Sequence, residues 1–255
     1  MTVPEVAHGE HLFWERVDTA RQVGRTISGR LMKFFVQPTR ADCVHTCTID
    51  DLVRMLSYLP PSDWDRIDAI LLRQPHRKQQ TLASVWGRLA YTADFVDGHS
   101  RVLYSGPAII IEAVNPTQPI KFGKRLSIDG IAELERLRSD GHKVDVHDKN
   151  HIVEPTLDAC RTTQLYRTLL HEVGHWVDLL EKVERPAIAN ASSDCTALLD
   201  MFHNRLSRER EQFAHAYADR LRARLVASQR IPFERQLDHD SLRHDNLLLQ
   251  DFEPS

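Results

Sequence analysis

The stretch that decides the fold is residues 165–180, which read LYRTLLHEVGHWVDLL and carry two histidines four positions apart at their centre. Apolar side chains recur along this stretch at helical spacing and no proline follows until Pro186, so we expect one long amphipathic helix. Positions four apart lie on one face of a helix, so His171 and His175 can present two imidazoles to one metal ion. Glu172, one position along, can reach a water on that ion.

The third metal ligand is expected in the next strong helix, residues 207–225. A catalytic zinc site takes three protein ligands and keeps one position open for water. Glu211 lies three positions before Ala214 on nearly the same face, and the small alanine would let the two helices approach closely. Glu209 is the rival, but no alanine follows it at that spacing. We therefore expect one Zn²⁺ ion, held by the two histidines and Glu211. The alternative is a buried helix that carries two surface histidines without a metal.

The pattern His-Glu-Val-Gly-His followed by Glu-x-x-Ala-x-x-Tyr-Ala resembles the Glu-zincins (gluzincins), zinc peptidases with two histidines on one helix and a glutamate on a later one. Asp178, three positions after the second histidine, makes it look like the catalytic domain of anthrax lethal factor and the related Mlc titration factor peptidases. The second half also looks like the ImmA/IrrE regulatory peptidases. The match covers residues 165–225 only. The resemblance implies that the two histidines and Glu211 bind zinc and that Glu172 is the general base.

The chemistry of these residues agrees with that assignment. Zinc lowers the pKa of a bound water toward about 7, Glu172 can take the proton, and the resulting hydroxide can attack a carbonyl. Glu172 can then return the proton to the leaving amine, without a covalent intermediate. Lethal factor-like enzymes place an oxyanion-stabilising tyrosine seven residues before the glutamate ligand, where this chain has Asn204 beside His203. His203 is the first candidate for that role, with Tyr217 and Tyr166 as alternatives.

Further polar residues near the pattern have two interpretations each. Asp178 lies one turn beyond the second histidine and could accept the outer N–H of a ligand histidine, which would fix its tautomer. A solvated surface carboxylate is the alternative. The loop before the helix contains His147 and His151, which could line a cleft or be exposed. The segment Cys43-Val-His45-Thr-Cys47 could offer three metal ligands, but its spacing is not that of a zinc knuckle.

The segments before the helix are rich in strand patterns. Apolar and β-branched runs bounded by turn residues predict strands at 31–36, 69–73, 85–95, 108–114 and 143–146. Helices are expected at 11–23, 48–59 and 127–138, and a solvated helix and tail after Pro232. This order favours the α+β class with a zincin-like layout. A mixed twisted sheet would occupy the N-terminal and middle part, with the active-site helix beneath it and further helices toward the C-terminus.

Two adjacent prolines suggest a domain boundary, and the composition suggests the class of protein and its compartment. Pro60-Pro61 suggests a boundary between a mostly helical N-terminal part, residues 1–60, and a zincin-like metallopeptidase domain, residues 61–255. The chain has 255 residues, a formal charge of -3, 42% hydrophobic residues and 27% charged residues, which is typical of a soluble globular protein. We expect no nucleic-acid partner and no membrane span. The four scattered cysteines and the lack of a signal-peptide pattern favour the cytoplasm, and signal-less export into a target cell stays open.

Three functions remain after these observations. The first is a zinc-dependent endopeptidase whose protein or peptide substrate lies extended along an edge strand of the sheet. The second is a catalytically silent zincin fold that binds or regulates a partner, against which the presence of Glu172 argues. The third is a zinc amidase with a non-protein substrate. The sequence names neither the substrate nor the oligomeric state.

Overall fold

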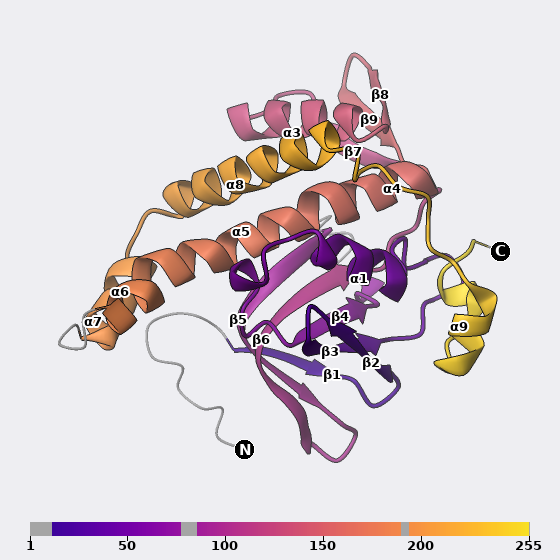
Figure 1. Ribbon diagram of the computed structural model, residues 1–255. Coiled ribbons are helices and arrows are strands. Elements are labelled where there is room, and N and C mark those ends of the chain that lie inside the picture. The colour runs from indigo at the N-terminus through magenta and orange to yellow at the C-terminus, as the bar shows by residue number, and fades with distance from the viewer. Residues whose placement is uncertain (1–11, 78–85, 190–193, 255) are drawn as a thin grey trace.

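A six-stranded mixed sheet is the main element of the computed structural model, which describes residues 12–77, 86–189 and 194–254 (Figure 1). The strand order is β1-β5-β6-β4-β3-β2. Strands β3, β4 and β6 are mutually parallel, β1 is parallel to β5, and the remaining neighbours are antiparallel. The bounds are β1 (Phe13–Arg16), β2 (Arg21–Ile27), β3 (Arg30–Val36), β4 (Ala69–Arg73), β5 (Gly87–Val96) and β6 (Val102–Glu112). The predicted α+β class is therefore confirmed at the level of a mixed sheet with helices.

The central strands are apolar on both faces because both faces of the sheet are covered. In β4, Ile70 and Leu72 pack into the larger core, between the sheet and the helices, whereas Ala69 and Leu71 pack into a second core on the opposite face. Successive side chains of a strand point to opposite faces, so a strand buried on both sides reads as a continuous apolar run. The run at 69–73 was predicted as a strand because Gln74 and Pro75 follow it, and the structure confirms the strand.

One almost continuous helical run lies across the face of the larger core (Figure 1). It consists of α4 (Leu157–Thr163), the turn η2 (Gln164–Thr168), α5 (Leu169–Leu179), the turn η3 (Leu180–Glu184) and α6 (Arg185–Ala189). The turns η2 and η3 are π-helical. Helix α5 carries the His-Glu-x-x-His pattern, and Leu169, Leu170 and Val173 from it are fully buried in the core. The predicted helix at 165–180 is therefore confirmed, although it extends further in both directions.

The other helices surround this run. Helix α8 lies alongside α5, and α3 lies next to the small antiparallel sheet of order β7-β9-β8 (Figure 1). The bounds of the remaining helices and strands are α1 (Ile49–Ser57), η1 (Pro61–Asp63), β7 (Ile120–Gly123), α3 (Ile128–Ser139), β8 (Lys143–Val146), β9 (Asn150–Glu154), α7 (Cys195–His203), α8 (Ser207–Ala227), α9 (His239–His244) and η4 (Leu249–Asp251). None of the described helices has both the length and the apolar character that a membrane span requires.

The prediction of a helix at 11–23 is wrong. In the described part of that segment, β1 and β2 are strands, and β2 pairs with β3 through a two-residue turn at Ser28 and Gly29. Both turn residues have positive φ, 49° and 81°, as a type I′ hairpin requires. The expected mostly helical character of residues 1–60 is therefore also wrong for its described residues. Strand β3 pairs with β4, so the sheet passes across the boundary placed at Pro60-Pro61.

The C-terminal segment is packed rather than solvated, which corrects the expectation of a solvated helix and tail. Leu242, Leu247 and Phe252 are buried in the larger core. Arg235 donates hydrogen bonds to the backbone oxygens of Thr46 and Phe252, which ties the end of the chain to the loop before α1. This loop contains the Cys43-Val-His45-Thr-Cys47 segment, in which His45 Nε2 donates a hydrogen bond to the Gln37 carbonyl oxygen at 2.8 Å.

Candidate metal centre

The close approach of α5 and α8 builds the candidate site. Gly174 of α5 faces Ala214 of α8 so closely that a Cβ atom at position 174 would lie 2.9 Å from the Ala214 carbonyl oxygen and 3.0 Å from its Cα. Ala214 is fully buried in this contact. This contact agrees with the expectation that a small alanine lets the two helices approach. The glycine at the fourth position of the His-Glu-Val-Gly-His pattern is the residue of α5 that Ala214 contacts. Glu211, one turn before Ala214, is thereby brought to the histidines of α5.

Three side chains converge at this point with spacings that suit one metal ion. The Nε2 atoms of His171 and His175 are 3.1 Å apart. Glu211 places Oε2 3.3 Å from His171 Nε2 and Oε1 3.5 Å from His175 Nε2. A tetrahedral zinc ion with ligand bonds of about 2.0–2.1 Å separates its ligand atoms by about 3.3 Å. Two imidazoles and one carboxylate at these distances therefore form a donor set that fits Zn²⁺.

The electrostatics of the cluster favour a carboxylate with positive partners. Hydrogen bonds to His171 and His175 hold the pKa of Glu211 far below its ordinary range, although burial opposes this shift. Burial alone would lower the pKa of His175, but the Glu211 hydrogen bond and the charge of Glu172 raise it overall. The site thus attracts positive charge. Because metal binding requires neutral imidazoles, a bound cation would displace protons from this cluster.

Glu172 lies beside the cluster and is held by the sheet. Its Oε2 accepts the backbone N–H of Leu89 in β5 at 2.7 Å, and the side chain is almost fully buried. Burial raises the pKa of Glu172, while the nearby His171 and His175 oppose the increase. One carboxylate oxygen is therefore fixed by a backbone donor, and the raised pKa favours protonation more than in a solvated carboxylate.

His215 is a candidate that sequence reasoning missed. Its ring lies 4.4 Å from the His171 ring, centroid to centroid, at an interplanar angle of 46°. Donor atoms of His171, Glu211 and His215 all lie within 4.8 Å of one another, so His215 offers another ligand at the edge of the cluster. Burial, followed by the charge of His171, lowers the pKa of His215 to about 4. Spacing within α8 places His215 on the same face as Glu211, but its approach to His171 follows from the packing of α5 against α8.

The alternatives for the oxyanion role lie in other environments. The Tyr217 hydroxyl donates to Asp63 Oδ2 at 2.7 Å. The Tyr166 hydroxyl accepts the backbone N–H of Phe233 at 3.0 Å. Both tyrosines are buried in the larger core, so their hydroxyls are already engaged there. His203 ends α7 and stacks edge-to-face on its neighbour Phe202, and its role stays a prediction.

Asp178 and Glu209 serve contacts outside the cluster. Asp178 is fully buried and accepts a hydrogen bond from Arg205 Nη1 at 2.7 Å, so the solvated alternative is wrong. In the part of the chain that the structure describes, neither Asp178 Oδ1 nor His171 Nδ1 has a hydrogen-bond partner, so the expected bond from a ligand histidine is not formed. Glu209 lies 3.6 Å from Arg205 Nε and is half exposed. Of the two glutamates considered, Glu211 is the one that reaches the histidines.

Comparisons with protein-family models, with curated proteins and with solved structures found no significant match for this chain. His171, Glu172, His175 and Glu211 are therefore assigned a role from their geometry and chemistry alone.

Proposed function

We propose that the chain is a zinc-dependent endopeptidase of the gluzincin type with a zincin-like fold. The observation that supports this best is the convergence of three donor atoms, from His171, His175 and Glu211, at separations of 3.1 to 3.5 Å. An ordinary buried helix with two surface histidines does not require a carboxylate from another helix at tetrahedral spacing. The buried carboxylate of Glu172 beside this set distinguishes a hydrolytic centre from a storage or structural site.

Each residue of the site has a separate role in the proposed hydrolysis. A zinc ion held by the two histidines and Glu211 would supply a Lewis acid and a water of lowered pKa. Glu172 takes the proton of the attacking water and later delivers it to the leaving amine nitrogen. The Leu89 N–H keeps the Glu172 carboxylate in one orientation during both transfers. His203 remains the candidate for stabilising the oxyanion.

Strand β5 offers a place for an extended substrate. Strand β1 pairs with residues 93–96 of β5, and no other described strand pairs with that side of residues 87–92. Backbone groups of alternate residues on such an edge point outward, and an added peptide strand would hydrogen-bond to them. The Leu89 N–H, which reaches Glu172, belongs to this outward set. A substrate on this edge would therefore pass next to the base and the metal ligands.

One observation favours a second candidate, a metal-binding module without catalytic activity. Structural zinc sites are closed by four protein ligands, whereas catalytic sites keep one position open. His215 lies against His171 and its donor atoms are within reach of the cluster. A rotation of this side chain would supply the fourth ligand and exclude water. The proposal of a peptidase requires that His215 stays outside the coordination sphere.

A set of variants tests the proposal and separates the two candidates. Zinc content and cleavage of a mixed peptide library are measured for the wild type, Glu172→Ala, Glu211→Ala and His215→Ala, with the exposed Glu181→Ala as the matched control. We expect one zinc per chain in the wild type and in Glu172→Ala, and loss of cleavage only in the latter. Glu211→Ala should lose zinc. Bound zinc without cleavage by the wild type would reject the peptidase, and a gain of cleavage in His215→Ala would favour the closed module.

A further inference from the structure

A large cavity formed by the described residues lies at the edge of the sheet, beside β1 and β5. It has a volume of about 1000 Å³ and is lined by β1, by the residues after β3 and β4, and by residues 88–92 of β5. It reaches both faces of the sheet, because Ala90 belongs to the second core whereas Leu89 and Tyr91 pack against the larger core. Strands β3 and β4 are parallel and both end at it. In open sheets, ligands bind at the carboxyl ends of parallel strands, and this volume suits a small organic molecule.

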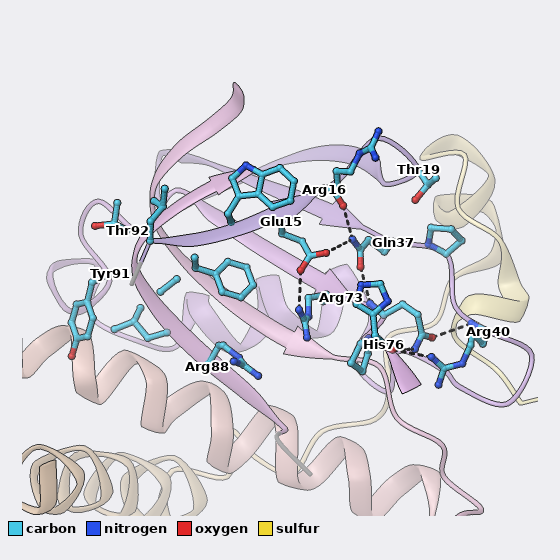
Figure 2. Close-up of a pocket in the computed structure, with 18 residues that line it drawn as sticks. Glu15, Arg16, Thr19, Gln37, Arg40, Arg73, His76, Arg88, Tyr91 and Thr92 are labelled. Carbon is cyan, nitrogen blue, oxygen red and sulfur yellow. Dashed lines mark hydrogen bonds and ion pairs between the residues drawn. The ribbon is translucent and has the colours of Figure 1, made fainter. Parts of the chain in front are cut away.

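The inner wall of the cavity is a rigid polar network around Arg73. This arginine is almost fully buried and donates from Nε to Glu112 at 2.9 Å and from Nη1 to Glu15 at 2.8 Å. Gln37 donates to the backbone oxygen of Arg16 at 2.9 Å and accepts from the backbone N–H of Gln74 at 2.9 Å. Figure 2 shows Arg73 pointing to Glu15 and Gln37 beside them. These polar groups are already oriented, so ligand binding would order few of them.

Arg88 differs from Arg73 in how well its charge is compensated. Both arginines share Glu112, but Arg73 has Glu15 in addition, whereas within the described residues Arg88 makes a single long hydrogen bond, from Nη2 to Glu112 at 3.3 Å. The Arg88 side chain is 43% exposed. Figure 2 places it on the Tyr91 side of the cavity, away from Gln37 and His76. The other two arginines of the lining, Arg16 and Arg40, pair with Asp18 and Asp42, so Arg88 carries the least compensated positive charge.

Aromatic residues supply the apolar part of the wall. Phe13 and Trp14 of β1 and Tyr91 of β5 line the cavity. The Trp14 side chain is 51% exposed, which is unusual for so large an apolar surface. Aromatic side chains next to a guanidinium suit a ligand with a planar apolar body and an anionic head group, because the ring can stack while the arginine binds the charge.

We propose that this cavity is a binding site for a small organic anion with an aromatic or otherwise planar apolar body. Arg88 binds the carboxylate or phosphate of the ligand with its terminal nitrogens, and Phe13 covers the apolar body. The Arg73–Glu15–Glu112 network holds the floor of the site and stays paired. The lining includes none of the three metal-ligand candidates, but the cavity borders the metal centre, because the Leu89 N–H donates to Glu172 and the Tyr91 hydroxyl donates to the backbone oxygen of His175.

Titration calorimetry with naphthalene-2-carboxylate tests this proposal, and naphthalene-2-carboxamide is the uncharged probe of the same shape. We expect one carboxylate bound per chain and the amide bound at least about 10-fold more weakly, because a charge-assisted hydrogen bond is lost. Arg88→Gln should weaken the carboxylate by about the same factor and leave the amide unaffected. Arg88→Lys should be intermediate, and Phe13→Ala should weaken both probes.

Controls keep the result specific to this cavity. Arg101→Gln removes an exposed arginine that pairs with Asp97 at the far end of the β5–β6 hairpin and should change neither affinity. Circular dichroism and urea midpoints establish that each variant is folded. Glu211→Ala should bind the carboxylate like the wild type, because Glu211 contacts His171 and His175 rather than a lining residue, so loss of zinc and loss of this site are separate results. Equal binding of the two probes, or carboxylate binding that Arg88→Gln and Arg88→Lys leave unchanged, would overturn the proposal.

Discussion

Gly174→Ala is the substitution that tests most directly whether contact between α5 and α8 assembles the metal site. The added Cβ would lie 2.9 Å from the Ala214 carbonyl oxygen, 3.0 Å from Ala214 Cα and 3.1 Å from Tyr217 Cδ1. Two of these atoms are backbone, so α8 must move as a unit. Ordinary carbon–oxygen contacts are about 0.4 Å longer than the first of these distances. Metal sites tolerate deviations of only about 0.2 Å in ligand distances, so Glu211 would leave its productive position.

Gly174→Ala has two opposing effects on the free energy of unfolding, and both can be measured separately from its effect on zinc affinity. Overpacking of a tight contact costs about 1–3 kcal/mol, whereas alanine gains about 1 kcal/mol over glycine in a helix interior. The apo protein should therefore lose no more than about 2 kcal/mol of unfolding free energy and remain folded. Zinc affinity should fall at least about 10-fold, because the displaced carboxylate can no longer bind together with the histidines.

Competition with a chromophoric chelator measures zinc affinity, and urea denaturation of the apo protein measures stability. Gly130→Ala in α3 is the matched control, since its Cβ would meet no atom closer than 3.4 Å. This control should keep wild-type zinc affinity and gain up to about 1 kcal/mol of stability. A Gly174→Ala protein with unchanged zinc affinity would refute the reasoning that close helix contact positions Glu211.

Two further predictions concern stability. Arg161→Met should lower the free energy of unfolding in urea by about 3–5 kcal/mol, because it leaves the fully buried Asp51 carboxylate without the Arg161 Nη2 donor at 2.7 Å. Arg243→Met at the surface should leave the urea midpoint unchanged. Burial lowers the pKa of His45 below its ordinary value of 6.5, so the unfolded chain takes up this proton first and stability should fall as the pH drops below 6.5. Between pH 7.5 and 5.5 the wild type should lose about 1 kcal/mol more than His45→Gln, and equal losses would contradict this assignment.

The parts of the fold that could be predicted have strong local signals. The helix expected at 48–59 is α1, which Thr48 caps through a capping box with Asp51. The helix around His171 was predictable because its apolar residues follow one period over many turns. The helix predicted at 11–23 failed because Phe13, Val17 and Ala20 fall at helical spacing, although the structure forms strands β1 and β2 there. Pairing of β1 with β5 decides for the strand, and this pairing joins residues about 80 positions apart, which a local pattern does not reveal.

Part of the candidate site could also be predicted, because some of its residues are set by local spacing. The spacing of His171 and His175 is local, and the Glu-x-x-Ala pattern identified Glu211 over Glu209. His215 was missed because its relation to His171 depends on how α5 and α8 pack, which spacing within one helix does not reveal. The pairing of Asp178 with Arg205 depends on the path of α6 and α7 between the two helices and was equally out of reach.

The π-helical turn η2 has a consequence for how insertions and deletions affect this helix. A π turn accommodates one residue more than an α turn, so deleting a residue within it would rotate everything on its N-terminal side by about 100° relative to α5. His171 and His175 would keep their mutual spacing. The side-chain amide of Gln164, however, now donates to the backbone oxygens of Trp86 and Glu112, at 3.0 and 2.6 Å, and would turn away from them. The length of this helix is therefore constrained separately from the identity of its metal ligands, because Gln164 anchors it to the strands that border the site.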